Sequence, residues 1–269
     1  MKIRLHEMRW PEVKEVLSKP NVVILPIGSV EQHGRHLPVN VDSAIATYVA
    51  ERSAEKVVKE HGIAAIVAPT IDYADISVHK MFPGTIGVKV DTLIKVISDV
   101  LESFIEQGFK NIVALSGHWE NRCSIESATR FAADRHPEAN LYVICTICIA
   151  MEIETSLTMI KAGTVGMGHA LETETSLSLV IQPQNVNLKD AGIGSRKLPL
   201  SAKHVGAIGM DTSKGVLYHP SARGFEETGT YGDPTKATRE LGEKTLALQI
   251  NNLSEMLVEI VRGVGESKE

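Results

Sequence analysis

The sequence predicts an α/β protein with three layers, α/β/α, built on a mostly parallel sheet covered by helices on both faces. Short, continuous apolar runs alternate along the chain with longer segments whose apolar residues recur at helical spacing. No linker-like stretch or repeat divides the 269 residues, and a chain of this length can bury a large core in one unit. We therefore expect a single domain over residues 1–269.

Four runs have the length and composition of strands buried on both faces. We predict these strands at residues 21–27, 64–67, 111–115 and 139–149. The last run contains Cys145 and Cys148, and Cys123 is the third cysteine of the chain. A small, odd number of cysteines argues against a disulfide framework. We interpret the C-x-x-C pair as buried strand residues and not as a metal or redox site.

Helical spacing predicts helices at residues 42–61, 91–107, 122–135 and 236–261, and one that begins irregularly within 167–181. Asp91 is the expected N-cap of the second helix, and Gly62 and Gly108 are expected stop signals. Residues 183–235 are rich in Gly, Pro, Ser and Asp, with little periodicity. Long loops of this kind are usually functional, so we expect this one near the site or at an oligomer contact.

Charge and hydropathy exclude several classes of protein. The net charge is -5 and no block of Lys or Arg stands out, so we expect no nucleic-acid partner. No apolar stretch reaches the length of about 18 residues that a membrane span needs, so we expect no membrane partner. The first residues lack the apolar core of a signal peptide, and we expect a cytoplasmic protein.

Two polar segments follow predicted strands, where open α/β sheets bind ligands. The first contains Glu31 and His33 and leads to Asp42, and the second contains His118 and Glu120. Residues two apart in an extended stretch point to the same side. Carboxylates and imidazoles without thiolates suit Zn²⁺ or Mn²⁺. Each residue alone has an ordinary explanation, such as a helix cap for Asp42, but the joint pattern favours a metal site.

Five segments resemble the creatininase family (creatinine amidohydrolases and their relatives). They are E-x-H-G-x-H-L-P at 31–38 followed by Asp42, G-H-x-E-N at 117–121, and the segments at 77–85, 169–176 and 229–234. The resemblance runs from about residue 8 to residue 265. Together these motifs are specific, although any one alone is weak. The resemblance implies a creatininase-like fold.

The resemblance also implies two divalent metal ions per chain, Zn²⁺ and/or Mn²⁺, with Fe²⁺ possible. Asp42 would bridge both ions, Glu31 and His118 would complete one site, and His33 and Glu120 would complete the other. In relatives that lack the second motif, a glutamate at the position of Glu172 is expected to supply the missing ligand. Because this chain has both glutamates, the last ligand is open, with Glu120 favoured.

Further roles follow from the resemblance. His169 and Glu172 are the expected acid/base residues, Ser77, His79 and Trp119 are expected to contact the substrate, and His36 is expected to contact the substrate or orient a ligand. The partners implied are a small-molecule substrate and other copies of the chain in a homo-oligomer, of which a hexamer is one form.

The predicted function is hydrolysis of a C–N bond (an amide, cyclic amide or formamide) by metal-activated water. Creatinine-hydrolysing members use tryptophans before the His169 segment, whereas this chain has only Trp10 and Trp119, and Leu171 replaces a usual glycine. Both departures argue against creatinine as substrate. The alternatives are C–C ring opening of a cyclic polyol ketone and a non-catalytic metal-binding protein. The glycines at 163–168 fit neither dinucleotide-binding nor P-loop spacing.

Overall fold

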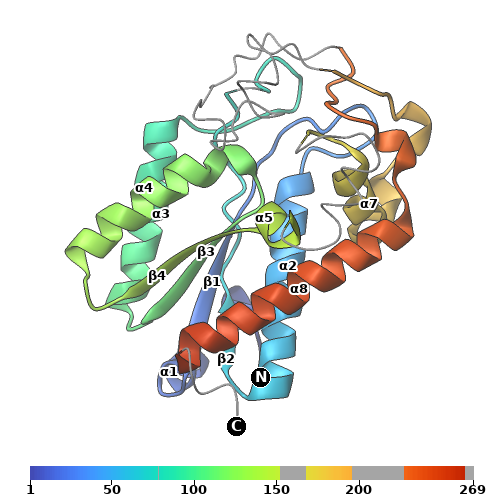
Figure 1. The fold of residues 1–269 in the computed structure, drawn as a ribbon. Coiled ribbons are helices and arrows are strands. Elements are labelled where there is room, and N and C mark those ends of the chain that lie inside the picture. The colour runs from blue at the N-terminus through green and yellow to red at the C-terminus, as the bar shows by residue number, and fades with distance from the viewer. Residues whose placement is uncertain (78, 152–167, 196–226, 264–269) are drawn as a thin grey trace.

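The computed structural model describes residues 1–77, 79–151, 168–195 and 227–263. Its centre is a parallel sheet with the strand order β2-β1-β3-β4 (Figure 1). The strands are β1 (Asn21–Ile27), β2 (Ala64–Val67), β3 (Asn111–Ser116) and β4 (Asn140–Cys145). The parallel sheet predicted from the alternating pattern is therefore confirmed.

Helices cover both faces of the sheet. One layer contains α1 (Trp10–Leu17), α3 (Val90–Glu106) and α4 (Arg122–Arg135). The other contains α2 (Val41–His61), α5 (Thr146–Met151), α7 (Glu172–Ile181) and α8 (Arg239–Arg262). Short 3-10 helices include η2 (Trp119–Asn121) and η7 (Pro234–Lys236). The three-layer α/β/α architecture predicted from the sequence is confirmed.

The central strand explains why the apolar runs are continuous. Val22 and Ile24 of β1 join the core under α2 and α8, whereas Val23, Leu25 and Ile27 join the core under α3 and α4. Because both faces are covered, alternate positions are all withdrawn from water. Burial of each such side chain contributes roughly 1.5–3 kcal/mol.

The prediction of one strand over residues 139–149 is wrong, because β4 ends at Cys145 and α5 begins at Thr146. Side chains of α8 stabilise the helical turn: Gln249 donates to the Thr146 carbonyl at 2.9 Å and Asn252 to the Ile149 carbonyl at 3.1 Å. Tertiary contacts thus override the β propensity of an apolar run. Cys145 and Cys148 are partly exposed and not buried.

Two acidic residues expected to cap helices lie inside the first turn instead. The helix predicted from Asp91 begins at Val90 and has Lys89 as its N-cap. Asp42 likewise follows the N-cap Asn40, whose side chain makes no capping hydrogen bond. A carboxylate in the first turn is stabilised by the helix dipole, and the side chain of Asp42 remains available for other contacts.

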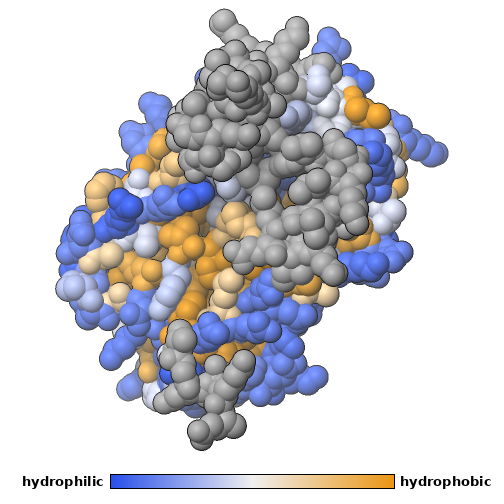
Figure 2. All heavy atoms as spheres, in the orientation of Figure 1, coloured by the Kyte–Doolittle hydropathy of each residue, from blue (hydrophilic) through white to orange (hydrophobic). Residues whose placement is uncertain are grey.

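The loops at the carboxyl edge of the sheet bring distant segments together. His169 pairs with Tyr231, and Gly194 pairs with Gly232, so parts of the long predicted loop lie beside the segment before α7. Residues 196–226 of that loop lie outside the described residues. Figure 2 shows apolar side chains gathered over the edge strand β4, between α4 and α8. Within the described ranges, no helix is long and apolar enough to cross a membrane.

Candidate functional site

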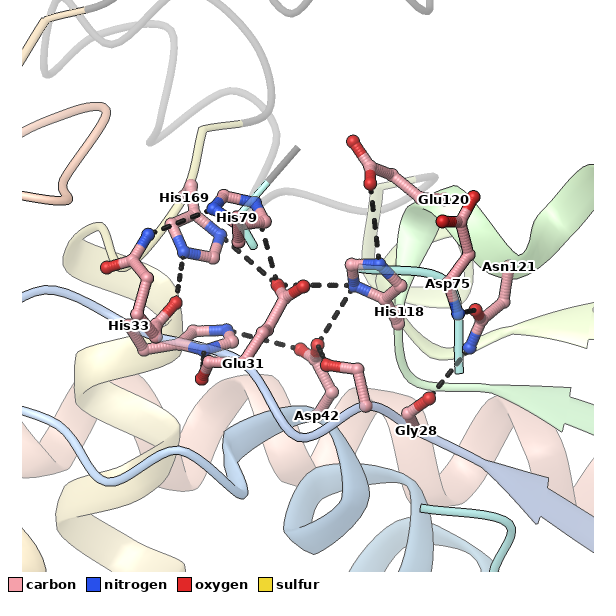
Figure 3. Close-up of polar contacts among 12 residues, drawn as sticks. Gly28, Glu31, His33, Asp42, Asp75, His79, His118, Glu120, Asn121 and His169 are labelled. Atoms are coloured by element: carbon pink, nitrogen blue, oxygen red, sulfur yellow. Dashed lines mark hydrogen bonds and ion pairs between the residues drawn. The ribbon is translucent and has the colours of Figure 1, made fainter. Parts of the chain in front are cut away.

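Polar side chains from four segments of the chain meet at the carboxyl edge of the sheet (Figure 3). Glu31 and His33 follow β1, Asp42 lies in the first turn of α2, and His118 follows β3. His169 enters from the segment before α7, and all five side chains are buried. The structure therefore brings together four of the five expected metal ligands and the expected acid/base histidine.

Asp42 lies between two imidazoles. Its Oδ2 is 2.9 Å from Nδ1 of His118, and its Oδ1 is 3.3 Å from Nε2 of His33. The Ser29 hydroxyl donates to Oδ2 at 2.6 Å, which fixes the carboxylate. Burial alone would raise the pKa of Asp42, but His33 and His118 outweigh it and hold that pKa well below its usual range. The two oxygens thus face two different halves of the site.

Glu31 is a fully buried carboxylate with histidines around it. Its Oε1 lies 3.4 Å from His118 Nδ1, 3.7 Å from His169 Nδ1 and 3.8 Å from His79 Nε2. Neither of its oxygens accepts a hydrogen bond within the described part of the chain. Burial raises the pKa of Glu31 well above its usual value, because desolvation disfavours the charged form. An ionised carboxylate here requires a cation beside it.

His33 is oriented as a metal-ligating histidine usually is. Its Nδ1 lies 3.2 Å from the Glu31 carbonyl, which can only accept a hydrogen bond, so Nδ1 carries a proton. Its Nε2 then faces Asp42 and, at 4.0 Å, Oε1 of Glu174. Burial lowers the pKa of His33, but the neighbouring carboxylates, Asp42 first, overcome it and raise the value to about 10. The site therefore has a strongly negative field.

Glu174 is the site residue that the sequence analysis missed. It lies in α7, and the backbone amide of Ala170 donates to its Oε2 at 2.5 Å, leaving Oε1 toward His33. Ala170 is the one non-glycine residue with a positive φ, 52°, among those the structure describes. Such a conformation costs roughly 1–3 kcal/mol and tends to occur at functional sites. Here it directs an amide at the carboxylate.

Glu172 lies elsewhere, although the sequence analysis named it. Residues two apart on a helix are about 200° apart around the axis, so Glu172 and Glu174 cannot face the same site. Burial raises the pKa of Glu172, and the charges that act on it are Lys236 and Asp233. The sequence holds two glutamates two positions apart at the start of this helix, and their spacing alone does not indicate which of them faces the site.

Glu120 reaches the site from its edge. Its Oε2 lies 3.8 Å from Nε2 of His118, whereas Asp42 and Glu31 face the other ring nitrogen (Figure 3). Its oxygens do not belong to any of the ligand groups found among the described residues. Those groups are Glu31–Asp42–His118, His33–His169–Glu174 and Glu31–His79–His169, each with ligand atoms within 4.8 Å of one another.

The contacts of His169 determine which of its two ring nitrogens carries a proton. Its Nε2 is 2.6 Å from the Gln32 carbonyl, so Nε2 must carry a proton, and Nδ1 faces Glu31. Its ring is stacked on that of His79 with centroids 4.1 Å apart. Burial, followed by the charges of His79 and His33, lowers the pKa of His169 well below its usual value. A neutral ring then presents the Nδ1 lone pair to the site.

The expected substrate contacts divide into two groups. His79 lies in the cluster, buried beside Glu31 and hydrogen-bonded to Gln32 at 3.0 Å. Ser77 is exposed and contacts Asp75, and Trp119 is half-buried in η2 with the Arg122 guanidinium 5.7 Å from its ring centroid.

His36 and Leu171 lie behind the site. His36 is buried, and its Nε2 lies 2.8 Å from the Thr175 hydroxyl. Leu171 packs against Gly168 and Gly232, where a Cβ would come within 2.4 Å and 2.8 Å of its side chain. The leucine that replaces the usual glycine is thus accommodated by two other glycines.

Close backbone packing fixes the loops relative to one another. A Cβ on Gly117 would lie 2.3 Å from the Asp42 carbonyl oxygen, so only glycine permits this approach of the His118 turn to α2. Asn121 donates to the Gly28 carbonyl at 2.7 Å and is fully buried. These contacts hold the expected ligands of different segments at fixed separations.

Comparison with known proteins gives a family. The family described as creatinine amidohydrolase (creatininase) matches residues 6–257. The chain is 28% identical over 244 residues to the mycofactocin precursor peptide peptidase of Mycolicibacterium smegmatis, covering 91% of this chain and 87% of that protein. It is 34% identical over 121 residues to the creatinine amidohydrolase of Pseudomonas putida, covering 43% and 44%. It is 24% identical over 269 residues to the 3-dehydro-scyllo-inosose hydrolase of Thermotoga maritima, covering 94% and 82%.

Solved structures agree on the fold. A crystal structure of creatinine amidohydrolase (creatininase) has a TM-score of 0.81 at 23% identity and covers 97% of this chain and 98% of that one. A structure described as creatininase Mn has the same TM-score and identity, with 97% and 100% covered. The family match spans nearly the whole chain and includes every segment of the buried cluster. The chain therefore belongs to the creatininase family of hydrolytic enzymes.

Proposed function

We propose that the chain is a dinuclear, metal-dependent hydrolase that cleaves a C–N bond of the amide class with activated water. The observation that supports this most strongly is the buried carboxylate of Glu31, whose oxygens lack hydrogen bonds from the described residues. Asp42 adds a second buried negative charge within 4.8 Å of it, and the largely buried Glu174 adds a third beside His33. Divalent cations would neutralise this charge, whereas water or a single proton would not.

The donor set fits two ions. Glu31, Asp42 and His118 form one of the ligand groups and would hold one ion. His33 and Glu174, together with Asp42, whose Oδ1 lies 3.3 Å from His33, would hold the other. All donors are carboxylate oxygens or imidazole nitrogens, which suits Zn²⁺ or Mn²⁺. Related creatininase structures described as Mn and Zn-Zn forms support the same metals. In this proposal Glu174 replaces Glu120 as the last ligand.

When bound, such ions would polarise the substrate carbonyl and lower the pKa of water toward about 7. The chain supplies the proton transfer. Nδ1 of His169 carries a lone pair and faces the cluster, so His169 accepts a proton from the attacking water and delivers it to the leaving nitrogen. His79, stacked on the His169 ring, holds it in place.

Glu120 has a different role in this proposal. Its Oε2 is buried, has no hydrogen-bond partner in the described ranges and lies at the edge of the ligand groups. A carboxylate in that position can hold a water or a substrate N–H beside the cluster. Glu120 therefore orients the nitrogen that leaves, next to His118.

The substrate we propose is a small amide, and a peptide amide is the first to test. Relatives named as a peptide peptidase and a creatinine amidohydrolase act on such bonds. Ile86 pairs with Val30, directly before Glu31, and is 58% exposed, so an exposed apolar side chain lies near the cluster. The tryptophans expected of creatinine-hydrolysing members are absent after Trp119. Ring opening of a cyclic ketone is the second candidate, because the Thermotoga maritima hydrolase aligns along 94% of the chain.

A hydrolysis panel tests the proposal. Protein loaded with Zn²⁺ or Mn²⁺ is incubated with short apolar peptides, a lactam, a formamide, creatinine and a cyclic polyol ketone. We expect release of a free amine from an amide member and none from the Asp42→Asn variant. Turnover of the ketone alone would contradict the C–N assignment. Bound ions without turnover of any compound would indicate a non-catalytic metal-binding protein.

A further inference from the structure

We propose that Cys145 and Cys148 form a reversible dithiol–disulfide couple, a redox site separate from the metal cluster. Cys145 is the last residue of β4, and Cys148 is the third residue of α5. The couple therefore spans the junction where the predicted long strand turns into a helix. It does not depend on the proposed hydrolytic function.

The junction brings the two thiols together. A residue directly before a helix and the residue three positions later lie on the same side of its first turn, with Cβ atoms about 5–6 Å apart. A disulfide needs Cβ atoms about 3.5–4.5 Å apart, so the two side chains must approach by about 1–2 Å when they are oxidised. The Cys145 thiol lies close enough to the side chain of Cys148 for Cys148 to be the largest influence on the pKa of Cys145, which it raises. In one continuous strand the same residues would point to opposite faces, because successive side chains alternate.

The two thiols differ in chemistry. Interaction with the Cys148 side chain, together with burial, raises the pKa of Cys145 and so disfavours the thiolate of Cys145. The Arg122 guanidinium interacts electrostatically with Cys148, and a nearby cation favours a thiolate. Both side chains are partly exposed, so a small oxidant can reach them. Cys148 is thus the attacking thiol and Cys145 the resolving one.

The oxidant we propose is a low-molecular-weight disulfide. The Cys148 thiolate attacks one of its sulfurs, forming a mixed disulfide and releasing one small thiolate. The Cys145 thiol then loses its proton to solvent and attacks the Cys148 sulfur, releasing the second small thiolate. The protein loses two electrons and two protons, and the small disulfide is reduced to two thiols.

The couple lies one strand away from a turn of the site. Cys145 pairs with Ser116 of β3, and the Ser116 hydroxyl donates to the His118 carbonyl at 2.7 Å. The helix that carries Cys148 is held on either side of that residue, because Gln249 and Asn252 of α8 donate to the carbonyls of Thr146 and Ile149.

Thiol mapping across defined ratios of reduced to oxidised glutathione tests the couple. Full-length, metal-loaded protein carries Cys123→Ser, because Cys123 is exposed and would react on its own. After equilibration, free thiols are alkylated and peptides are analysed by mass spectrometry. We expect both thiols to be lost together as a Cys145–Cys148 disulfide and regained when reduced glutathione is in excess.

A matched variant distinguishes a couple from two independent thiols. In Cys123→Ser/Cys145→Ser, we expect a stable mixed disulfide between glutathione and Cys148, because the resolving thiol is absent. The proposal is overturned if the Cys123→Ser parent accumulates the same mixed disulfide. It is also overturned if both of its thiols are alkylated at every ratio while the thermal melting of the protein is unchanged.

Discussion

Oε1 of Glu174 lies 4.0 Å from Nε2 of His33, with both side chains turned toward Asp42. This separation is too long for a hydrogen bond, yet the second oxygen of Glu174 is fixed by an amide and the second nitrogen of His33 faces a carbonyl. A carboxylate oxygen and an imidazole nitrogen that are each held in place and face each other across such a gap are expected where both bind one metal ion, since metal–ligand bonds are about 2.0–2.2 Å long.

The first prediction separates the two glutamates of α7. Glu174→Gln removes the negative charge with little change of shape, and we expect the protein to lose one of the two proposed ions. Glu172→Gln is the matched control and should keep both, because Glu172 interacts with Lys236 and Asp233. Elemental analysis of dialysed protein measures the difference. The reverse pattern, with the ion lost from Glu172→Gln alone, would contradict the ligand set.

The second prediction concerns His169. In His169→Gln the amide nitrogen can still donate to the Gln32 carbonyl, but the basic Nδ1 is gone. We expect kcat to fall by roughly 10²–10⁴-fold, with metal content unchanged. Steady-state kinetics on the substrate found by the panel, together with elemental analysis, checks both parts. Loss of an ion in parallel with activity would make His169 a ligand and not the proton carrier.

The third prediction tests the packing between loops. In Gly117→Ala the new Cβ would lie 2.3 Å from the Asp42 carbonyl oxygen, so the His118 turn must move. We expect a loss of about 1–3 kcal/mol in the free energy of unfolding and weaker metal binding. Gly192→Ala is the control, since its Cβ meets an ordinary contact at 3.6 Å and should change stability by less than about 0.5 kcal/mol. Equal behaviour of the two variants in urea unfolding would refute this.

The fourth prediction concerns acid stability. Burial lowers the pKa of His36 to about 4, from an ordinary value of 6.5. The unfolded chain therefore binds this proton more tightly, so the stability that neutral His36 provides is complete above about pH 6.5 and is lost as the pH falls toward 4. Allowing for screening by solvent, we expect this loss to lower the free energy of unfolding by about 2 kcal/mol.

Comparison with His36→Gln isolates this contribution. Glutamine can keep the hydrogen bond to Thr175 but does not titrate, so its unfolding free energy should fall less between pH 6.5 and 4. Any bound metal should be lost alike from both proteins in acid, so the difference between their curves reports on His36. Parallel curves would show that His36 is not held neutral by the fold.

Local pattern predicted most of the fold. The run 21–27 and the helix 122–135 were predicted with the bounds that the structure has, because burial on both faces and helical spacing leave plain signals. The single strand over 139–149 failed because α5 depends on hydrogen bonds from Gln249 and Asn252, which lie about a hundred positions later in the sequence. Contacts of that range leave no mark in a local apolar run.

The site was predictable only in part, because some of its residues are placed by the strand topology and others by local geometry that the sequence pattern does not show. Glu31, His33, Asp42 and His118 all follow strands whose carboxyl ends share one edge, so their convergence follows from the topology. Glu174 depends on the rotational setting of α7, which begins only at Glu172 after the unusual backbone of Ala170. The sequence offered two glutamates in that helix, and the phase of its first turn decides which one faces His33.

Metal content tests the central claim most directly. The full-length protein, purified without chelator and dialysed in the presence of Zn²⁺ or Mn²⁺, should retain about two ions per chain, and Asp42→Asn should lose both because each oxygen of Asp42 faces a different half of the site. Circular dichroism confirms that each protein is folded. A well-folded wild-type protein that retains no ion, or an Asp42→Asn variant that keeps its full complement, would contradict the account.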